Sequence, residues 1–154
     1  MDLFSDFRDL LAAFAESGVR YVLIGGYAVV FHGRPRATKD LDLLVAVDAD
    51  NRERLGQALS AFGAPASVAN AARTMTSDDI VYFGASPLRV DLLGSASGLD
   101  FDGVLARAVL TSLDDVRVPI IALDDLIANK RASGRPRDLE DCAVLERVRA
   151  KGRV

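Results

Sequence analysis

The segment DLDLLVAV, residues 40–47, alternates between two kinds of position along its length. Its odd-numbered positions are all Leu or Val, and its even-numbered positions begin with Asp40 and Asp42. Successive side chains of a strand point to opposite faces of the sheet, so this period of two predicts a strand with both aspartates on one face. Because Asp is depleted in strands, the pair indicates a functional role. The alternative is that both acids line a solvated sheet edge.

The residues before this strand predict three further elements. Apolar residues spaced three and four apart over residues 3–14 favour an amphipathic helix that Gly18 can end. VRYVLIG, residues 19–25, is a short β-rich run typical of a strand buried on both faces. GYAVVFHG, residues 26–33, then fits a short helix between glycines. The predicted order up to the acidic strand is therefore helix, strand, helix, strand.

The middle of the chain supplies a third acid. Residues 51–62 have a helical apolar stripe, with Asp50 and Glu53 as a capping box, and residues 63–79 are expected to form a loop with at most one helical turn. IVYFG (80–84) and LRVDLLG (88–94) predict a hairpin, with residues 85–87 between its strands. Period-two alternation puts Asp91 on the same face as Arg89.

The remaining residues predict a short helix near 101–108, one strand and two final helices. VRVPII, residues 116–121, is expected to be an edge strand because Pro119 lacks a ladder N–H. The final helices run from an Asp124 N-cap to residue 133 and from Pro136 toward residue 150. This succession predicts one α/β (α+β) domain over residues 1–154, a mixed, twisted sheet flanked by helices.

Charge and apolar runs exclude some classes of protein. The net charge of −3 argues against a uniformly basic surface, but residues 129–154 hold eight Lys or Arg against four Asp or Glu, a local charge of +4. Any nucleic acid would therefore bind at this local basic region.

The apolar runs span roughly 4 to 8 residues, and a membrane helix needs about 20. A cytoplasmic protein that does not contact a membrane is expected, and the single Cys142 cannot form an internal disulfide.

Asp40, Asp42 and Asp91 can gather at one place on the predicted sheet. Carboxylates packed together repel each other, and without a cation at least one would stay protonated. Mg²⁺ removes this difficulty because it binds carboxylate and phosphate oxygens in an octahedral shell. The three acids therefore point to a magnesium site that takes a nucleotide.

Several motifs resemble one known family. Gly25-Gly26, a gap of thirteen residues, Asp40-Leu41-Asp42 and a later Asp91 within LRVDLL resemble the nucleotidyltransferase fold of the DNA polymerase β-like superfamily. RPRATKDLDLLV (34–45) and DDLIANKRASGRPRDLEDCAVL (124–145) resemble small bacterial nucleotidyltransferases related to abortive-infection toxins. The resemblance extends discontinuously over most of the chain.

The resemblance implies a set of roles. Gly25 and Gly26 would contact nucleotide phosphates, Asp40 and Asp42 would bind two Mg²⁺ ions, and Asp91 would complete one of these sites. The implied reaction moves a nucleotidyl group from a nucleoside triphosphate such as ATP to an acceptor hydroxyl, with a tRNA or other RNA, or a protein, favoured as the acceptor. A toxin with an antitoxin partner is also implied. The alternative is a non-catalytic nucleotide-binding or antitoxin-like protein of the same fold.

Four further residues are candidates for nucleotide binding. Gly26 supplies no hydroxyl, so the phosphate contact is expected to come from the backbone or from a neighbour, for which Arg36 and Thr38 are candidates. Lys130 lies in an apolar helical stripe, where it either extends its ammonium into water or, as the resemblance implies, binds phosphate. Asp138 matches the acid that the toxin-like members place after the lysine, but a structural salt bridge explains it nearly as well. Arg135, Arg137 and Arg149 are candidates for contacting the acceptor, and His32 is expected to be structural.

Overall fold

The structure is a computed structural model that describes residues 3–84 and 88–152. The predicted connection at residues 85–87 lies outside these ranges. Within them the chain forms seven helices and six strands. In chain order these elements are α1 (Leu3–Glu16), β1 (Tyr21–Ile24), α2 (Gly25–Phe31), β2 (Asp40–Val45), α3 (Ala49–Phe62), α4 (Ala66–Thr74), β3 (Ile80–Phe83), β4 (Arg89–Leu93), α5 (Phe101–Arg107), β5 (Val109–Leu113), β6 (Val116–Ile120), α6 (Leu123–Ser133) and α7 (Pro136–Gly152).

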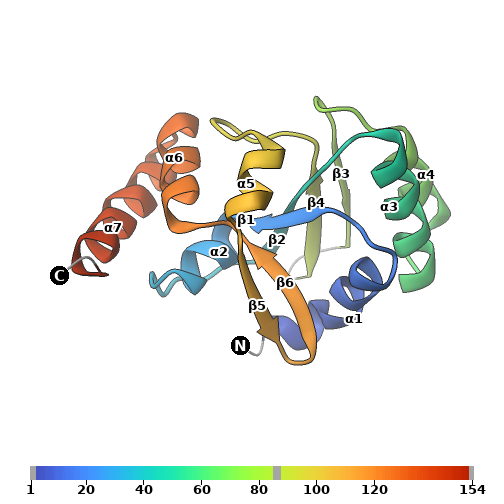
Figure 1. Cartoon of the computed structure of the whole chain (residues 1–154), viewed down its shortest axis with the longest axis horizontal. Coiled ribbons are helices and arrows are strands. Elements are labelled where there is room, and N and C mark those ends of the chain that lie inside the picture. The colour runs from blue at the N-terminus through green and yellow to red at the C-terminus, as the bar shows by residue number, and fades with distance from the viewer. Residues whose placement is uncertain (1–2, 85–87, 153–154) are drawn as a thin grey trace.

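All six strands belong to one mixed sheet, in the order β3-β4-β2-β1-β6-β5. β2 runs parallel to β4 and β1 runs parallel to β6, whereas the other neighbouring pairs are antiparallel. Figure 1 shows the sheet between two groups of helices, with α3 and α4 at one end of the molecule and α6 and α7 at the other. The predicted mixed sheet flanked by helices is therefore confirmed.

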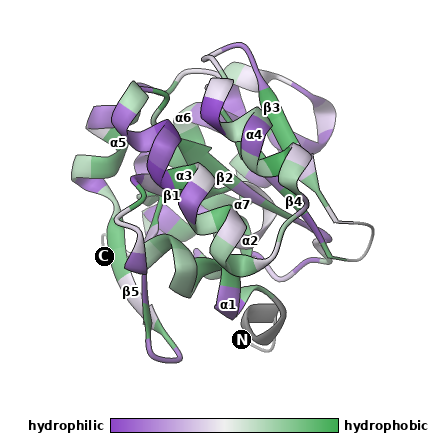
Figure 2. Cartoon of the chain, turned by 90° about the vertical axis from the view of Figure 1, so that its right-hand side faces the viewer, coloured by the Kyte–Doolittle hydropathy of each residue, from purple (hydrophilic) through white to green (hydrophobic). Residues whose placement is uncertain are grey.

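The core lies where the central strands meet the helices. Leu41 and Leu43 of β2 and Leu92 of β4 are almost completely buried, and they alternate with the half-buried acids of the same strands. Figure 2 shows hydrophobic strands at the centre of the molecule and helices that combine hydrophobic and hydrophilic residues. The period-two pattern thus buries one side of β2 and β4 and leaves the acids on the other.

The first helices form close to where the sequence predicts them. Gly18 follows α1 with φ +67°, and the N–H of Val19 donates to the carbonyl of Phe14 at 3.0 Å. α3 begins earlier than predicted, because the carboxylate of Asp48 accepts from the N–H of Asn51 at 3.2 Å. The predicted capping box of Asp50 and Glu53 is therefore wrong.

The segment predicted as a loop, residues 63–79, contains the nine-residue helix α4. Its alanines favour a helix even without a strong apolar stripe, because Ala has the highest helix propensity. Ala69 and Ala72 are buried, and α4 packs against α3. α4 is therefore stabilised by packing along one narrow face of small side chains, and not by the wide stripe of large apolar residues from which a helix is usually predicted.

The predicted edge strand lies inside the sheet instead. β6 is flanked by β1 and by β5, a strand that the sequence analysis did not predict, and β5 forms the edge. Pro119 faces Leu110 of β5, and the ladder with β1 is confined to Leu23 and Ile120. Because that ladder begins only after Pro119, the missing proline N–H does not interrupt it.

The helices at the end of the chain begin and end near their predicted positions. α6 starts at Leu123 after an Ala122 N-cap, so Asp124 lies in the first turn and is not the cap. Gly134 ends α6 with φ +68°, and α7 starts at Pro136 as predicted. In residues 3–84 and 88–152, none of the helices has the length and apolar character needed to cross a membrane.

Candidate functional site

Two of the predicted site acids face each other across neighbouring strands. Asp42 of β2 is the register partner of Asp91 of β4, and its partner on the other side is Ile24 of β1. Asp91 is in turn opposite Tyr82 of β3. These four residues form one row across four strands. Side chains of directly opposite residues lie close enough to interact, so the parallel pairing brings the two carboxylates together.

The electrostatic environment of Asp42 does not favour its ionised form. Burial raises the pKa of the Asp42 carboxyl well above its ordinary value. The charge of Asp91, a hydrogen bond with Asp91 and the charge of Asp40 raise this pKa further, whereas the charge of Lys130 lowers it. The strands thus hold acids together without enough positive charge to balance them.

Asp40 is close enough to influence Asp42, but it is not part of the same pair. Its register partner on β4 is Arg89, not Asp91. Across the described residues, no three or more His, Cys, Asp or Glu side chains form a group that could hold a metal ion. Two carboxylates are nevertheless enough for Mg²⁺ when substrate phosphates and water supply the other ligands. Asp42, whose negative charge is disfavoured, and the neighbouring Asp91 fit such an ion, with Asp40 at the margin.

Gly25 contacts the acid pair through its backbone. It has φ +73°, and a Cβ built on it would overlap Oδ2 of Asp42 and lie 2.9 Å from its Cγ. A glycine is therefore required at this position both by conformation and by space. The predicted glycine pair thus begins α2 directly against the carboxylate of β2.

Gly26 brings two more predicted residues to the start of α2. A Cβ on Gly26 would overlap Oγ1 of Thr38 and lie 3.3 Å from Nη2 of Arg36. Nε of Arg36 is buried and has no hydrogen-bond partner among the described residues. Thr38 and Arg36 therefore lie over the first turn of α2, where backbone N–H groups lack helical partners.

Asp141 is a buried acid that the sequence analysis did not identify. Its side chain is 0% exposed, and its carboxylate is 2.7 Å from Nη1 of Arg34. Nη2 of Arg36 lies 3.2 Å from the same carboxylate, and Nζ of Lys130 lies 3.3 Å from it. A buried carboxylate is stable as an ion only with such partners, so Asp141 fixes three cations from two segments. The sequence does carry a signal for Asp141, because this residue lies three positions after Asp138, one helical turn further along α7 and close to its apolar face.

Asp138 completes this cluster of charges. Its carboxylate accepts from Nζ of Lys130 at 3.1 Å, from Nε of Arg135 at 2.8 Å and from Oγ of Ser133 at 2.5 Å. Burial alone would raise the pKa of Asp138, but the hydrogen bonds from Ser133, Arg135 and Lys130 outweigh it and hold the pKa at about 2. The salt bridge that was the alternative for Asp138 is present.

Lys130 does not extend its ammonium into water, because its side chain is only 8% exposed. It pairs with both Asp138 and Asp141 and also acts on Asp42 through its charge. These charged residues form what we call the basic cluster, which has four cations and two acids: Arg34, Arg36, Lys130, Arg135, Asp138 and Asp141. Within this cluster, Lys130 is the member whose charge acts on Asp42.

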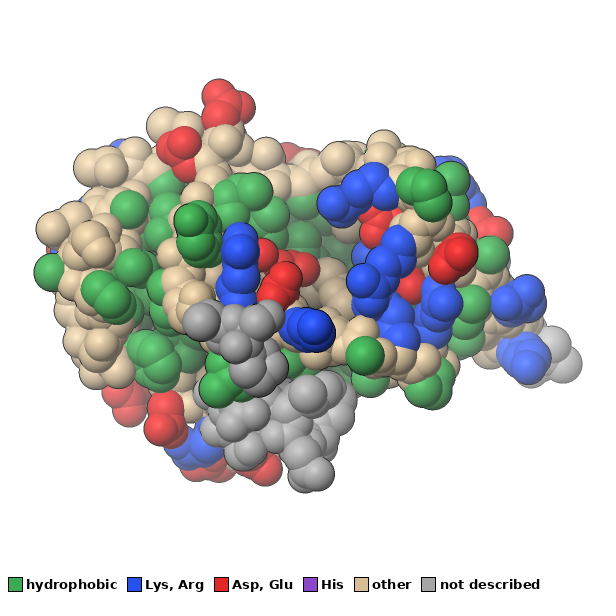
Figure 3. All heavy atoms as spheres, turned by 180° about the vertical axis from the view of Figure 1, so that it is seen from behind, with side chains coloured by type: hydrophobic (Ala, Val, Ile, Leu, Met, Phe, Trp, Pro, Cys, Tyr) green, Lys and Arg blue, Asp and Glu red, His purple; other side chains and the backbone are tan. Residues whose placement is uncertain are grey.

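The other side of the acid pair carries one more cation. Nε of Arg89 donates to Oδ1 of Asp91 at 2.8 Å, and the guanidinium lies 4.3 Å from the centroid of the Tyr82 ring. Figure 3 shows a hollowed face of the molecule on which acidic side chains lie between two groups of Lys and Arg side chains. This juxtaposition of opposite charges suits a metal–phosphate ligand.

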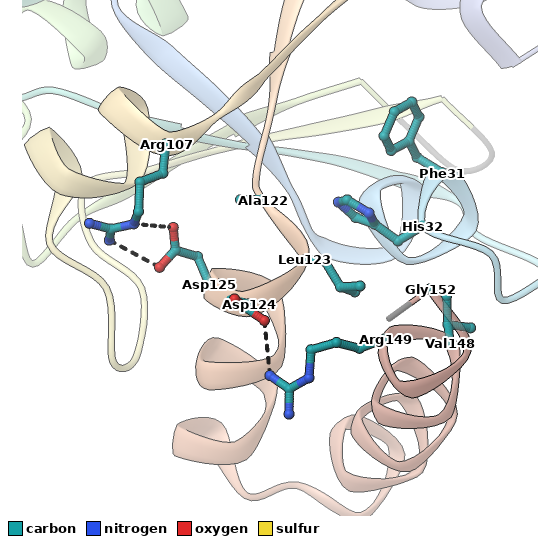
Figure 4. A pocket seen from close by; sticks show the side chains of 10 residues that line it. All are labelled: Phe31, His32, Arg107, Ala122, Leu123, Asp124, Asp125, Val148, Arg149 and Gly152. Carbon is teal, nitrogen blue, oxygen red and sulfur yellow. Dashed lines mark hydrogen bonds and ion pairs between the residues drawn. The ribbon is translucent and has the colours of Figure 1, made fainter. Parts of the chain in front are cut away.

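Two of the arginines predicted to contact the acceptor, Arg137 and Arg149, lie in different places. Arg137 donates to the carbonyl of Ala37 at 3.4 Å, next to Thr38. Arg149 pairs with Asp124 at 2.9 Å and lines an open cavity of 530 Å³, where Arg107 also pairs with Asp125 (Figure 4). None of the predicted site acids lines this cavity, so Arg149 does not lie at the acid pair.

His32 lines the same cavity and bonds the carbonyl of Ile121 through Nε2 at 2.6 Å (Figure 4). This contact joins the end of α2 to the residue that follows β6. It agrees with the structural role predicted for the only histidine of the sequence.

Comparisons with known proteins concern the fold and the family of the chain. A crystal structure of an antigenic nucleotidyltransferase-like protein from Paracoccidioides brasiliensis superposes with a TM-score of 0.56 at 16% identity, over 93% of this chain and 74% of that chain. At this identity the likeness shows the fold alone. No curated protein matches the sequence. The family model described as "Nucleotidyl transferase of unknown function" matches residues 3–154. The chain therefore belongs to this nucleotidyl transferase family.

Proposed function

We propose that this protein moves a nucleotidyl group from a nucleoside triphosphate to an acceptor hydroxyl in a reaction that requires Mg²⁺. The observation that carries the proposal is the pairing of Asp42 with Asp91 across parallel strands, with Gly25 in contact with Asp42. A structural domain has no need to place Asp91 beside a half-buried Asp42 whose negative charge it disfavours. A site that receives a cation does need them.

Asp42 and Asp91 would hold the metal, and Asp40, two residues along the same strand, would join them as a ligand of a second ion. Two bound Mg²⁺ ions would supply positive charge to the phosphates and to the attacking and leaving oxygens. The carboxylates themselves are fixed by the sheet, so little reorganisation is required when the substrate binds. No side chain is required as a nucleophile.

The triphosphate would lie between the acid pair and the basic cluster. Arg36, with a buried Nε that lacks a partner in the described part of the chain, and Thr38 lie beside Gly26 at the start of α2. Lys130 would contact phosphate while Asp138 holds its ammonium in place. Positioning of the triphosphate in line with the acceptor would be the main contribution of these residues.

The acceptor is proposed to be a macromolecule, either RNA or protein. The local charge of +4 over residues 129–154 favours a polyanion. Arg135 belongs to the basic cluster, and Arg137 lies in the first turn of α7 and donates to the carbonyl of Ala37. An enzyme that modified cellular RNA or protein without control would act as a toxin. A partner that covers the cleft would then be its antitoxin.

The proposal is tested by incubating the protein with Mg²⁺, a cell lysate and each nucleoside triphosphate radiolabelled at the α-phosphate. Transfer of label to RNA or to protein is expected, and Asp42→Asn and Asp91→Asn should abolish it. Label that enters only a small alcohol or an aminoglycoside would contradict the macromolecular acceptor. Nucleotide binding without any transfer would instead favour the non-catalytic alternative.

A further inference from the structure

Arg89 occupies a position that a bound cation would also need. Its Nε lies 2.8 Å from Oδ1 of Asp91, which is one of the two carboxylates proposed to hold Mg²⁺. Its register partner on β2 is Asp40. A single guanidinium thus lies beside two of the three acids of the site.

The ion pair between Arg89 and Asp91 is exposed enough to be exchanged for another partner. The side chain of Arg89 is 41% exposed, and exposed ion pairs of this kind contribute little to stability. Asp91 by contrast is 16% exposed and is held by its strand. The acid is therefore the fixed member of the pair, and the arginine is the member that can move.

Tyr82 gives the guanidinium a second place to bind. Its ring is 4.3 Å from the guanidinium carbon of Arg89, it is 59% exposed, and it lies opposite Asp91 in the row of partners. A cation over an aromatic face is favourable without any carboxylate. Arg89 can therefore leave Asp91 and remain next to the site.

We propose that Arg89 is the resident counter-ion of Asp91, which a divalent cation must displace before the site can bind nucleotide. This inference rests on the proposed function. A divalent ion exceeds the charge of Arg89 and binds both carboxylates, so the exchange favours the metal when it is present. When it is absent, Arg89 limits the repulsion around Asp91. Arg89 is thus a positioning residue that sets the metal affinity of the site.

The test measures Mn²⁺ binding to the substrate-free protein by isothermal titration calorimetry. Arg89→Ala removes one charge and one competing ion pair, so its dissociation constant for Mn²⁺ should fall about threefold to tenfold relative to wild type. Arg89→Gln should behave in the same way, and Arg89→Lys should stay near wild type because it keeps the charge. The difference between Arg89→Ala and wild type should shrink at high salt, because competition between charges is screened.

Arg54→Ala is the matched control, since Arg54 also donates to an aspartate, Asp50, at 2.9 Å but lies on α3 away from the acid pair. Its Mn²⁺ affinity should equal that of the wild type. Thermal melts of all variants show whether each is folded. Because Arg89→Ala and Arg89→Gln both remove the charge, the test can still be read if one of them does not fold.

The outcomes separate the two proposals. Wild type that binds Mn²⁺ through Asp42 and Asp91, with no tightening in either neutral Arg89 variant, would overturn the role of Arg89 and leave the proposed function intact. Wild type and all variants that fail to bind Mn²⁺ would overturn both. Tightening that is equal in Arg54→Ala would show a general charge effect and would also overturn the role of Arg89.

Discussion

The backbone of Gly25 packs directly against the carboxylate of Asp42, so no side chain larger than a hydrogen atom fits at position 25. We expect Gly25→Ala to lose nucleotidyl transfer, because the new methyl group would displace the Asp42 carboxylate that it overlaps. It should also lower the free energy of unfolding by more than about 1 kcal/mol, since φ +73° is unfavourable for alanine. Transfer assays and urea denaturation measure both effects.

Gly63→Ala provides the control for this prediction. Gly63 also has positive φ, at +98°, but a Cβ there meets nothing within 4 Å. The variant should lose stability through backbone strain and keep its transfer activity. Equal loss of activity in both variants would show that backbone strain alone disables the protein.

Asp42→Asn should separate stability from activity. The substitution removes a charge that burial and two neighbouring acids disfavour, so the free energy of unfolding should stay unchanged or rise by about 1 kcal/mol at neutral pH. Transfer should be abolished because a metal ligand is lost. Urea denaturation and label transfer on the same preparation test this, and marked destabilisation would mean that Asp42 has a structural role.

Asp141→Asn should be destabilising, by about 3 kcal/mol, because it leaves Arg34, Arg36 and Lys130 without their buried acid. An exposed pair provides the comparison. Asp50→Asn removes the partner of Arg54 on the surface of α3 and should cost less than about 1 kcal/mol. Similar losses in the two variants, measured by denaturation, would contradict the view that Asp141 organises the basic cluster.

The depressed pKa of Asp138 predicts a pH dependence of stability. Its folded-state value of about 2 lies below the ordinary value of 3.8, so the unfolded chain binds the proton more tightly. The stabilisation, about 2 kcal/mol, is fully present above pH ~4 and is lost as the pH falls toward 2. Asp138→Asn should lack this part of the acid transition, and a titration curve identical to wild type would refute the assignment.

Replacing the buried Tyr21 is expected to stabilise the protein. Its hydroxyl is buried, and no partner for it is found in the described residues, so burial raises the pKa of Tyr21. Tyr21→Phe removes an unsatisfied polar group and should raise the free energy of unfolding by up to about 1 kcal/mol. Tyr82→Phe, at an exposed position, should leave it unchanged. A less stable Tyr21→Phe would indicate that the hydroxyl has a partner after all.

Local patterns in the sequence predict the acidic strands well, because period-two alternation fixes the face of Asp42 and Asp91 without knowledge of the fold. They do not fix the register that makes these two residues direct partners, since strand pairing depends on the whole sheet. Asp141 was missed for a similar reason: its partner Arg34 lies 107 residues away in the sequence. α4 was missed because its buried face consists of small residues that give little periodic signal.

The parallel pairing of β2 with β4 also bears on how the chain folds. Parallel neighbours cannot be joined by a tight turn, and here residues 46–88, with α3, α4 and β3, lie between them. Closing so long a connection is entropically expensive, so contacts of this kind tend to slow folding. The same closure brings Asp42 against Asp91, and their repulsion adds to the barrier at that step. Dissolved salt screens this repulsion, so the charge of the site becomes part of the folding problem as well as of the chemistry.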